Sequence, residues 1–170
     1  MIKKLLFAVM LALPICISAQ ALKFGTVNSA EIFNVMPDKA TAEATLKAAS
    51  EKYDAEFKRL QEDFQKDYDE YAKLEKDTTT PAAIKERHQK ELQDKYTKIQ
   101  NFQQTAAQDL QKQQEQLLAP IQTKLQQAIQ AVGAENGFTY IFDLSVPSIA
   151  YSGNGSQDVT PLVKAKLNIK

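Results

Sequence analysis

The sequence predicts an α+β protein: a small β body with a long inserted α-helical hairpin, or tentacle. Along two long stretches, apolar residues recur at alternating steps of three and four, which is the spacing of one helix face. A single turn-forming run near 77–81 separates these stretches. Short segments rich in β-branched and aromatic residues flank them. We therefore expect residues 20–36 and 134–170 to form the body, and residues 37–133 the hairpin arm.

Residues 1–19 have the pattern of a cleavable signal peptide. A basic start precedes an apolar run at 5–17, and small residues follow it. We place the cleavage after Ala19, with Ala21 as the second choice. An N-terminal membrane anchor is the alternative, although the apolar run is short for a membrane span. The pattern predicts an exported protein.

The composition narrows the classes of function. The chain has 21 basic and 21 acidic residues, so no charge excess favours nucleic acid. Loss of Lys3 and Lys4 with the leader would leave 19 basic residues against 21 acidic ones, a net charge of −2. Cys16 is the only cysteine and lies in the leader. The mature protein is therefore expected to have no disulfide and no thiol chemistry.

The N-terminal part of the body should contain one strand and one short helix. Residues 22–27 have strand character. Asn28 can cap a helix over 29–36, and Glu31 stands at the capping-box position. Pro37 then suits the first position of the long helix, over 37–76.

Each arm of the hairpin has an apolar stripe with an 11-residue repeat. An 11-residue period is close to the natural helix repeat, so the arms should be straight or slightly right-handed. Gln103 and Gln114 fall on the second stripe, which predicts an uneven, partly polar seam. The first stripe contains Leu46, Ala49, Tyr53, Phe57, Leu60, Phe64, Tyr68 and Tyr71, and the second Ile99, Gln103, Ala106, Leu110, Gln114, Leu117, Ile121, Leu125, Ala128 and Val132.

The returning helix should run over 81–134. Thr80 is predicted as its N-cap and Pro81 as its first residue. Pro120 lies inside this helix and removes one backbone donor, so we expect a kink there, with a full break as the alternative.

The C-terminal part of the body should add two strands and a short helix. Residues 138–143 are apolar on both faces, which favours a central strand. Residues 148–151 are predicted as a second strand and 152–156 as a loop. Thr160 and Pro161 should open a last helix that ends near Leu167.

No group of residues predicts catalysis, a metal or a cofactor. His88 is the only histidine, and one histidine cannot build a catalytic triad or a histidine-based metal site. Asp63, Asp67 and Glu70 share a helix face, but lysines stand among them, which favours a salt-bridged surface. An enzyme is therefore the least favoured class.

Aromatic residues on the first arm are the candidate binding residues. Some must pack against the second arm, because long helices need tertiary burial. The polar seam leaves part of this stripe available to a third party, and exposed apolar surface indicates partner binding. The candidates are Tyr53, Phe57, Phe64, Tyr68 and Tyr71.

The mature chain resembles the Skp/OmpH family of periplasmic chaperones. At the N-terminal end the resemblance lies in strand 24–27, Ile32 and the Met36-Pro37 pair. The C-terminal body resembles the family over 135–143, 149–152 and 158–160. The resemblance implies a jellyfish-like homotrimer whose hairpins enclose unfolded outer-membrane β-barrel proteins without ATP. We also expect no nucleic acid partner, given the balanced charge, and no stable membrane insertion, given the short apolar run.

The small body is expected to be stabilised by self-association, since domains of this size rarely hold together alone. The candidate residues for this contact are Phe24, Val27, Ile32, Phe33, Ile141, Ile149 and Val163. The slightly acidic net charge departs from the basic arms of the best-known relative, so no lipopolysaccharide site is assigned. The rival function is a coiled-coil envelope spacer or adaptor with one fixed partner.

Overall fold

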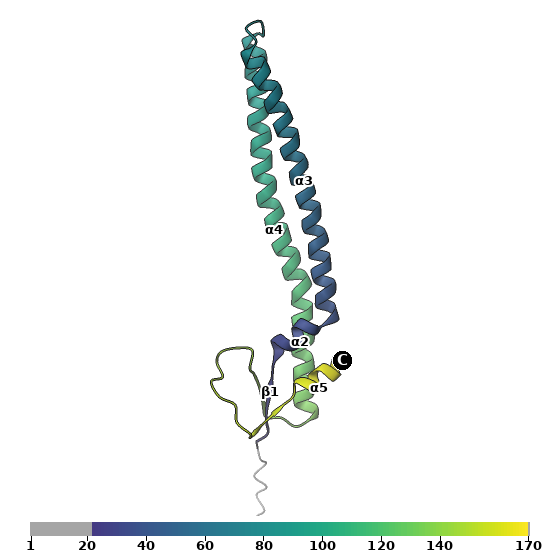
Figure 1. The fold of residues 1–170 in the computed structure, drawn as a ribbon. Helices are drawn as coiled ribbons and strands as arrows, with labels where there is room; N and C mark the ends of the chain where they lie inside the picture. Colours follow the sequence, from purple (N-terminus) through teal and green to yellow (C-terminus); the bar gives the residue numbers. More distant parts are fainter. Residues whose placement is uncertain (1–21, 170) are drawn as a thin grey trace, which may run out of the picture.

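The computed structural model describes residues 22–169 and has the predicted α+β fold class (Figure 1). A small three-stranded sheet with two short helices forms the body, and two long helices project from it. The predicted signal peptide lies outside the described residues. In chain order the elements are β1 (Phe24–Val27), α2 (Ser29–Val35), α3 (Pro37–Lys76), α4 (Ala82–Glu135), β2 (Tyr140–Asp143), β3 (Ser156–Asp158) and α5 (Thr160–Lys166).

The turn between the arms is built around Asp77, which also sets where α4 begins. The Asp77 carboxylate accepts hydrogen bonds from the hydroxyl and backbone N–H of Thr79 and from the Thr80 hydroxyl. These bonds hold the pKa of Asp77 below its usual value. The prediction that Thr80 caps α4 is wrong, because its hydroxyl is engaged by Asp77 and Pro81 occupies the cap position.

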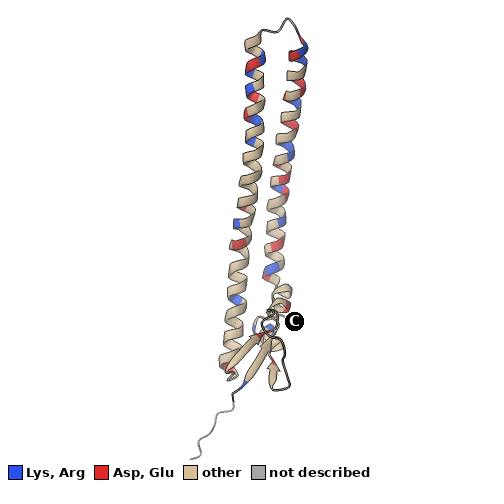
Figure 2. Ribbon diagram, turned by 90° about the vertical axis from the view of Figure 1, so that its left-hand side faces the viewer, with Lys and Arg blue, Asp and Glu red and all other residues tan. Residues whose placement is uncertain are grey.

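Four cross-links between the arms share one register. They join Asp38 to Lys124, Tyr53 to Asp109, Asp67 to Lys95, and the Asp77 carbonyl to Lys85. In each link the two residue numbers add to 162. The two helices therefore keep one alignment from the body to the tip, as the 11-residue repeat predicts for nearly straight arms (Figures 1 and 2).

Pro120 does not break α4, which continues from Ala82 to Glu135. The helix ends in a Schellman motif: Phe138 N–H donates to the Gly133 carbonyl (2.9 Å), and Gly137 N–H donates to the Ala134 carbonyl. Gly137 has φ of +67°, a conformation that favours glycine. Helix α4 thus reaches from the tip of the arm into the body.

The sheet has the order β2-β1-β3 with all strands parallel, and two predictions about it are wrong. β1 is the central strand, and β2 lies at an edge with Tyr140 60% exposed. Residues 148–151 form no strand; β3 lies at Ser156–Asp158, where it begins at the last residue of the predicted loop. The apolar pattern of 138–143 arises from its packing on α4 and its exposed aromatic face, rather than from a central position.

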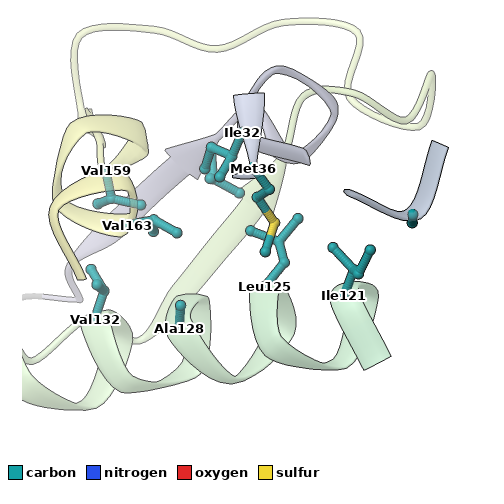
Figure 3. Close-up of a cluster of buried hydrophobic side chains, with 10 residues drawn as sticks. Ile32, Met36, Ile121, Leu125, Ala128, Val132, Val159 and Val163 are labelled. Atoms are coloured by element: carbon teal, nitrogen blue, oxygen red, sulfur yellow. The ribbon is translucent and has the colours of Figure 1, made fainter. Parts of the chain in front are cut away.

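The hydrophobic core lies where α4 crosses the body (Figure 3). Figure 3 shows Val159 and Val163 packed over Val132 on one side of α4. Ile32 and Met36, from α2 and the residue that follows it, lie over Leu125. The base of α4 is therefore the surface on which both ends of the body assemble.

Candidate functional site

The aromatic stripe of the first arm divides into a packed part and an exposed part. Tyr53 belongs to the packed part: its ring lies 6.0 Å from that of Phe102, and its hydroxyl donates to Asp109. The Asp109 carboxylate raises the pKa of Tyr53. Hydrogen bonds from Tyr53 and Gln113 in turn lower the pKa of Asp109. Tyr53 is thus part of the contact between the arms.

A second group of aromatic residues lies nearer the tip and is partly open to solvent. Phe64 stacks on Tyr68 with 6.4 Å between ring centroids, and Tyr96 lies 6.3 Å from Phe64. Tyr68 is 51% exposed and Tyr96 is 48% exposed. We call these three residues the outer aromatic cluster. Phe57 and Tyr71, the other two candidates, are half-buried along the same helix.

The sequence analysis missed two aromatic residues on the second arm. Phe102 takes a seam position, whereas Gln103, which was predicted there, is exposed. Gln114 is exposed as well, and its neighbour Gln113 lies half-buried beside Asp109. Extending the three-and-four spacing backwards from Ile99 would have found Tyr96.

Residues of both charge signs are interspersed along the arms (Figure 2), and several of them form ion pairs. Lys47 pairs with Glu51 and Lys58 with Glu62, so the same ion pair repeats after 11 residues. Arg59 contacts both Glu56 and Asp63. Such exposed pairs stabilise a helix only slightly, so they indicate a solvated surface rather than a binding site for one sign of charge.

Within residues 22–169, no group of three or more acidic, histidine or cysteine side chains is arranged to hold a metal ion. The predicted acidic face is divided between two cations, since Asp63 contacts Arg59 and Asp67 contacts Lys95. His88 lies 3.3 Å from Glu91 and is less exposed than a freely solvated side chain. No helix of the described chain is both long and apolar enough to cross a membrane.

The body has an open aromatic surface on its sheet. Phe24 stacks on Tyr140 with 6.3 Å between centroids, and Phe142 lies 6.2 Å from Phe24. A cavity of about 440 Å³ separates this surface from the loop at 144–155. Tyr151, in that loop, is 86% exposed. We call these four aromatic residues the open sheet face.

The candidate residues for self-association fall into three groups. Val27, Ile32 and Val163 are at most 1% exposed and belong to the core of this chain, so they cannot form a contact between copies without its rearrangement. Phe33 and Ile141 are partly buried against that core. Phe24 and Ile149 line the cavity at the open sheet face.

This architecture, with a small parallel sheet and a long hairpin in constant register, matches a known family. A family model described as outer membrane protein (OmpH-like) matches residues 23–167. The chain belongs to the OmpH-like family.

One solved structure with this OmpH-like fold comes from Caulobacter crescentus and is described as that of a proposed outer membrane chaperone. It superposes with a TM-score of 0.74 at 17% sequence identity, and the match covers 86% of this chain and 84% of that one. At this identity the likeness establishes the fold alone. Comparison with curated proteins gives no match.

Proposed function

We propose that this OmpH-like protein is an ATP-independent holdase, which binds unfolded outer-membrane proteins in the periplasm and prevents their aggregation. The observation that supports this proposal is the outer aromatic cluster, where Tyr68 and Tyr96 expose about half of their surface on an extended arm. Exposed aromatic surface of this kind contributes binding energy without requiring a defined partner sequence. The proposal includes no catalytic step and no cofactor.

Client retention would come from many weak contacts. Burial of apolar surface contributes roughly 25 cal/mol per Å², so partial burial of one ring yields only a modest free energy. Several such contacts acting together along the arm can retain a client, although each single contact is easily reversed. Release to the next partner therefore needs no chemical energy. We keep Tyr53, Phe57 and Tyr71 as secondary candidates, since each would contribute only if the arms separate.

The proposal includes self-association through the body, as a homotrimer. The open sheet face supports it, because Tyr140 and Phe142 stay exposed beside Phe24, and only a cavity separates this aromatic surface from the loop at 144–155. A contact between copies at this face would place the arms side by side and present several outer aromatic clusters to one client.

The test is an aggregation assay on the mature protein. An outer-membrane β-barrel protein unfolded in urea is diluted with and without it, and light scattering is followed; a soluble enzyme that refolds readily is the control client. We expect suppression near one oligomer per barrel. The variant Phe64→Ser/Tyr68→Ser/Tyr96→Ser should weaken suppression severalfold and leave the oligomeric state unchanged. Equal suppression by wild type and variant would remove the cluster from the proposal.

The rival function is an envelope spacer with one fixed partner, and the constant register of the arms favours it. Four cross-links in one register indicate an ordered hairpin, which is what a spacer with a fixed partner requires. A spacer predicts no suppression of aggregation at any ratio or salt concentration. It also predicts that an unfolded client gives no protection to the turn at 77–81 during limited proteolysis.

A further inference from the structure

Helix α4 has a regular row of six glutamines and one glutamate on the face opposite the seam. Its seven members are spaced by three, four or seven residues, which places them on one side of a helix. All seven are exposed. The row, which we call the glutamine ridge, consists of Gln100, Gln104, Gln108, Gln111, Glu115, Gln122 and Gln126.

The glutamine ridge is long and almost free of charge. It spans 26 residues of helix, or about 39 Å at 1.5 Å per residue. Gln111 donates to Glu115 at 3.2 Å. The other five glutamines form no hydrogen bond with another described residue. Figure 2 shows the contrast: charged residues crowd the part of the arm near the tip, and they are sparse on α4 nearer the body.

At its lower end the ridge meets a groove between α2 and α4. Gln122 and Gln126 line this cavity of about 450 Å³, together with the apolar side chains of Phe33, Leu125 and Ile129. Asp143 also lines the groove, but its carboxylate is engaged by Ser29 and by the Ser145 backbone. The groove therefore has an apolar floor beside neutral amides.

We propose that the glutamine ridge and this groove bind the backbone of an extended, unfolded polypeptide. A primary amide has both donors and an acceptor, as a peptide group has. An unfolded chain has free peptide groups all along its length, so the ridge can bind it whatever its sequence. A nucleic acid, an anionic lipid or a strongly charged peptide would find no matching charge along this row.

The dimensions fit such an occupant. An extended chain advances about 3.3 Å per residue, so the ridge matches a segment of roughly 12 residues. The groove at its end accepts one apolar side chain of that segment. The inference rests on the proposed holdase function, and it adds a second contact surface on the opposite side of α4 from its packing against α3.

The first experiment maps the client by photo-cross-linking in the full mature protein. The photoreactive residue p-benzoylphenylalanine replaces Gln104 or Gln108 on the ridge, Tyr68 in the outer aromatic cluster, or Lys58 on the solvated face of α3. The probe is a urea-unfolded outer-membrane β-barrel protein diluted into buffer. Client cross-links from both ridge positions, with few from Lys58, are expected.

Three other outcomes would overturn the inference. Client cross-links from Tyr68 without any from the ridge would reject the ridge and leave the holdase function standing. Cross-links from the ridge to another copy of the chain, unchanged by client, would make this face an interface between copies. No client cross-link at any position, with no suppression of aggregation, would reject the proposed function together with the inference.

The second experiment compares two matched double variants. Gln104→Glu/Gln108→Glu removes the amide donors of the ridge, and Gln61→Glu/Gln65→Glu makes the same change at the same spacing on α3. Loss of two hydrogen bonds should weaken client binding about fivefold in the ridge variant, with a change below about twofold in the control. Equal effects of the two variants would show that added charge alone is responsible and would overturn the inference.

Discussion

At the scale of single residues, Asp143 connects the sheet to the helix that leads into the arm. It ends β2, and its carboxylate accepts hydrogen bonds from the backbone N–H of Ser29 (3.2 Å) and of Ser145 (2.9 Å) and from the Ser29 hydroxyl. Burial raises the pKa of Asp143, but these hydrogen bonds lower it more, so the net direction is downward. The carboxylate thus also stabilises the start of α2.

We expect the stability of the body to fall in acid because of Asp143. A carboxyl whose pKa is lower in the folded state binds more protons when unfolded, so its contribution is present above the unfolded pKa and is lost as the pH falls through the folded value. The variant Asp143→Asn should be destabilised by about 1–2 kcal/mol at pH 7. It should also lose this part of the pH dependence below about pH 4.

Urea unfolding of both proteins between pH 3 and pH 7 measures this contribution. Asp77→Asn, at the tip turn, is the control for a carboxyl with a lowered pKa outside the body. Parallel stability curves for wild type and Asp143→Asn would contradict the assignment.

At the scale of elements, the arms combine an 11-residue repeat with a constant register. Ion pairs and aromatic residues recur after 11 positions on α3, and the same register extends from Asp38 at the base to Asp77 at the tip. Cross-links that share one register disfavour a slip of one helix along the other. Arm length is therefore modular: a block of 11 residues in each arm can be removed together.

Deleting residues 46–56 with 106–116 should leave a folded hairpin that is shorter by roughly 16 Å. The deletion preserves the register on both sides and removes Tyr53 and Asp109 as a pair. Deleting 46–56 alone leaves 11 residues of α4 without a partner, so we expect lower helicity and cleavage there. Circular dichroism and limited proteolysis compare the two proteins. Equal melting of both would show that register does not matter.

Pro120 should lower the stability of α4, although the helix remains continuous. Proline cannot donate to the carbonyl of Gln116, and its ring crowds the preceding turn. Replacement by alanine should raise the free energy of unfolding by about 1–3 kcal/mol, because alanine restores the backbone donor and relieves the crowding. Thermal unfolding tests this, with Ala119→Ser as a control substitution beside it. An unchanged or lower stability would mean that the backbone here is adapted to proline.

The hairpin was predictable from sequence because its helices obey a local periodicity. The spacing that ends at Leu125, Ala128 and Val132 identified residues that are buried in the core. The order of the strands was not predictable in this way. Strands of three or four residues have little pattern, and which one is central depends on how the chain returns to the sheet.

The candidate site was only partly predictable for a related reason. Periodicity identifies the side of a helix that faces its partner, but not how far each ring is covered. Tyr53 and Tyr68 fall on the same stripe, yet one is bound to Asp109 and the other is half-exposed. Gln103 and Gln113 lie about 80° apart around an ideal helix, and the side-chain packing leaves Gln103 exposed and Gln113 half-buried.

At the scale of the whole molecule, the open sheet face predicts how copies associate. The variant Phe142→Ser/Tyr151→Ser should shift the oligomer towards monomer at micromolar concentration, because it removes two aromatic side chains from the proposed contact. Sedimentation velocity measures the shift, and Tyr68→Ser in the arm is the control. A variant that stays fully oligomeric would place the contact elsewhere.

The unequal attachment of the two arms gives the molecule a mechanical asymmetry. α4 is one rod of 54 residues, about 80 Å long, whose base forms part of the core. α3 follows a break at Met36, where the backbone is extended, and its base is held by the buried side chain of Ala42 and by the Asp38–Lys124 ion pair. A sideways load at the tip therefore applies torque to the core through the base of α4, and the cross-links between the arms make α3 move with it. Small rotations of the core become large sweeps of the tip, and a load held at the tip strains the core.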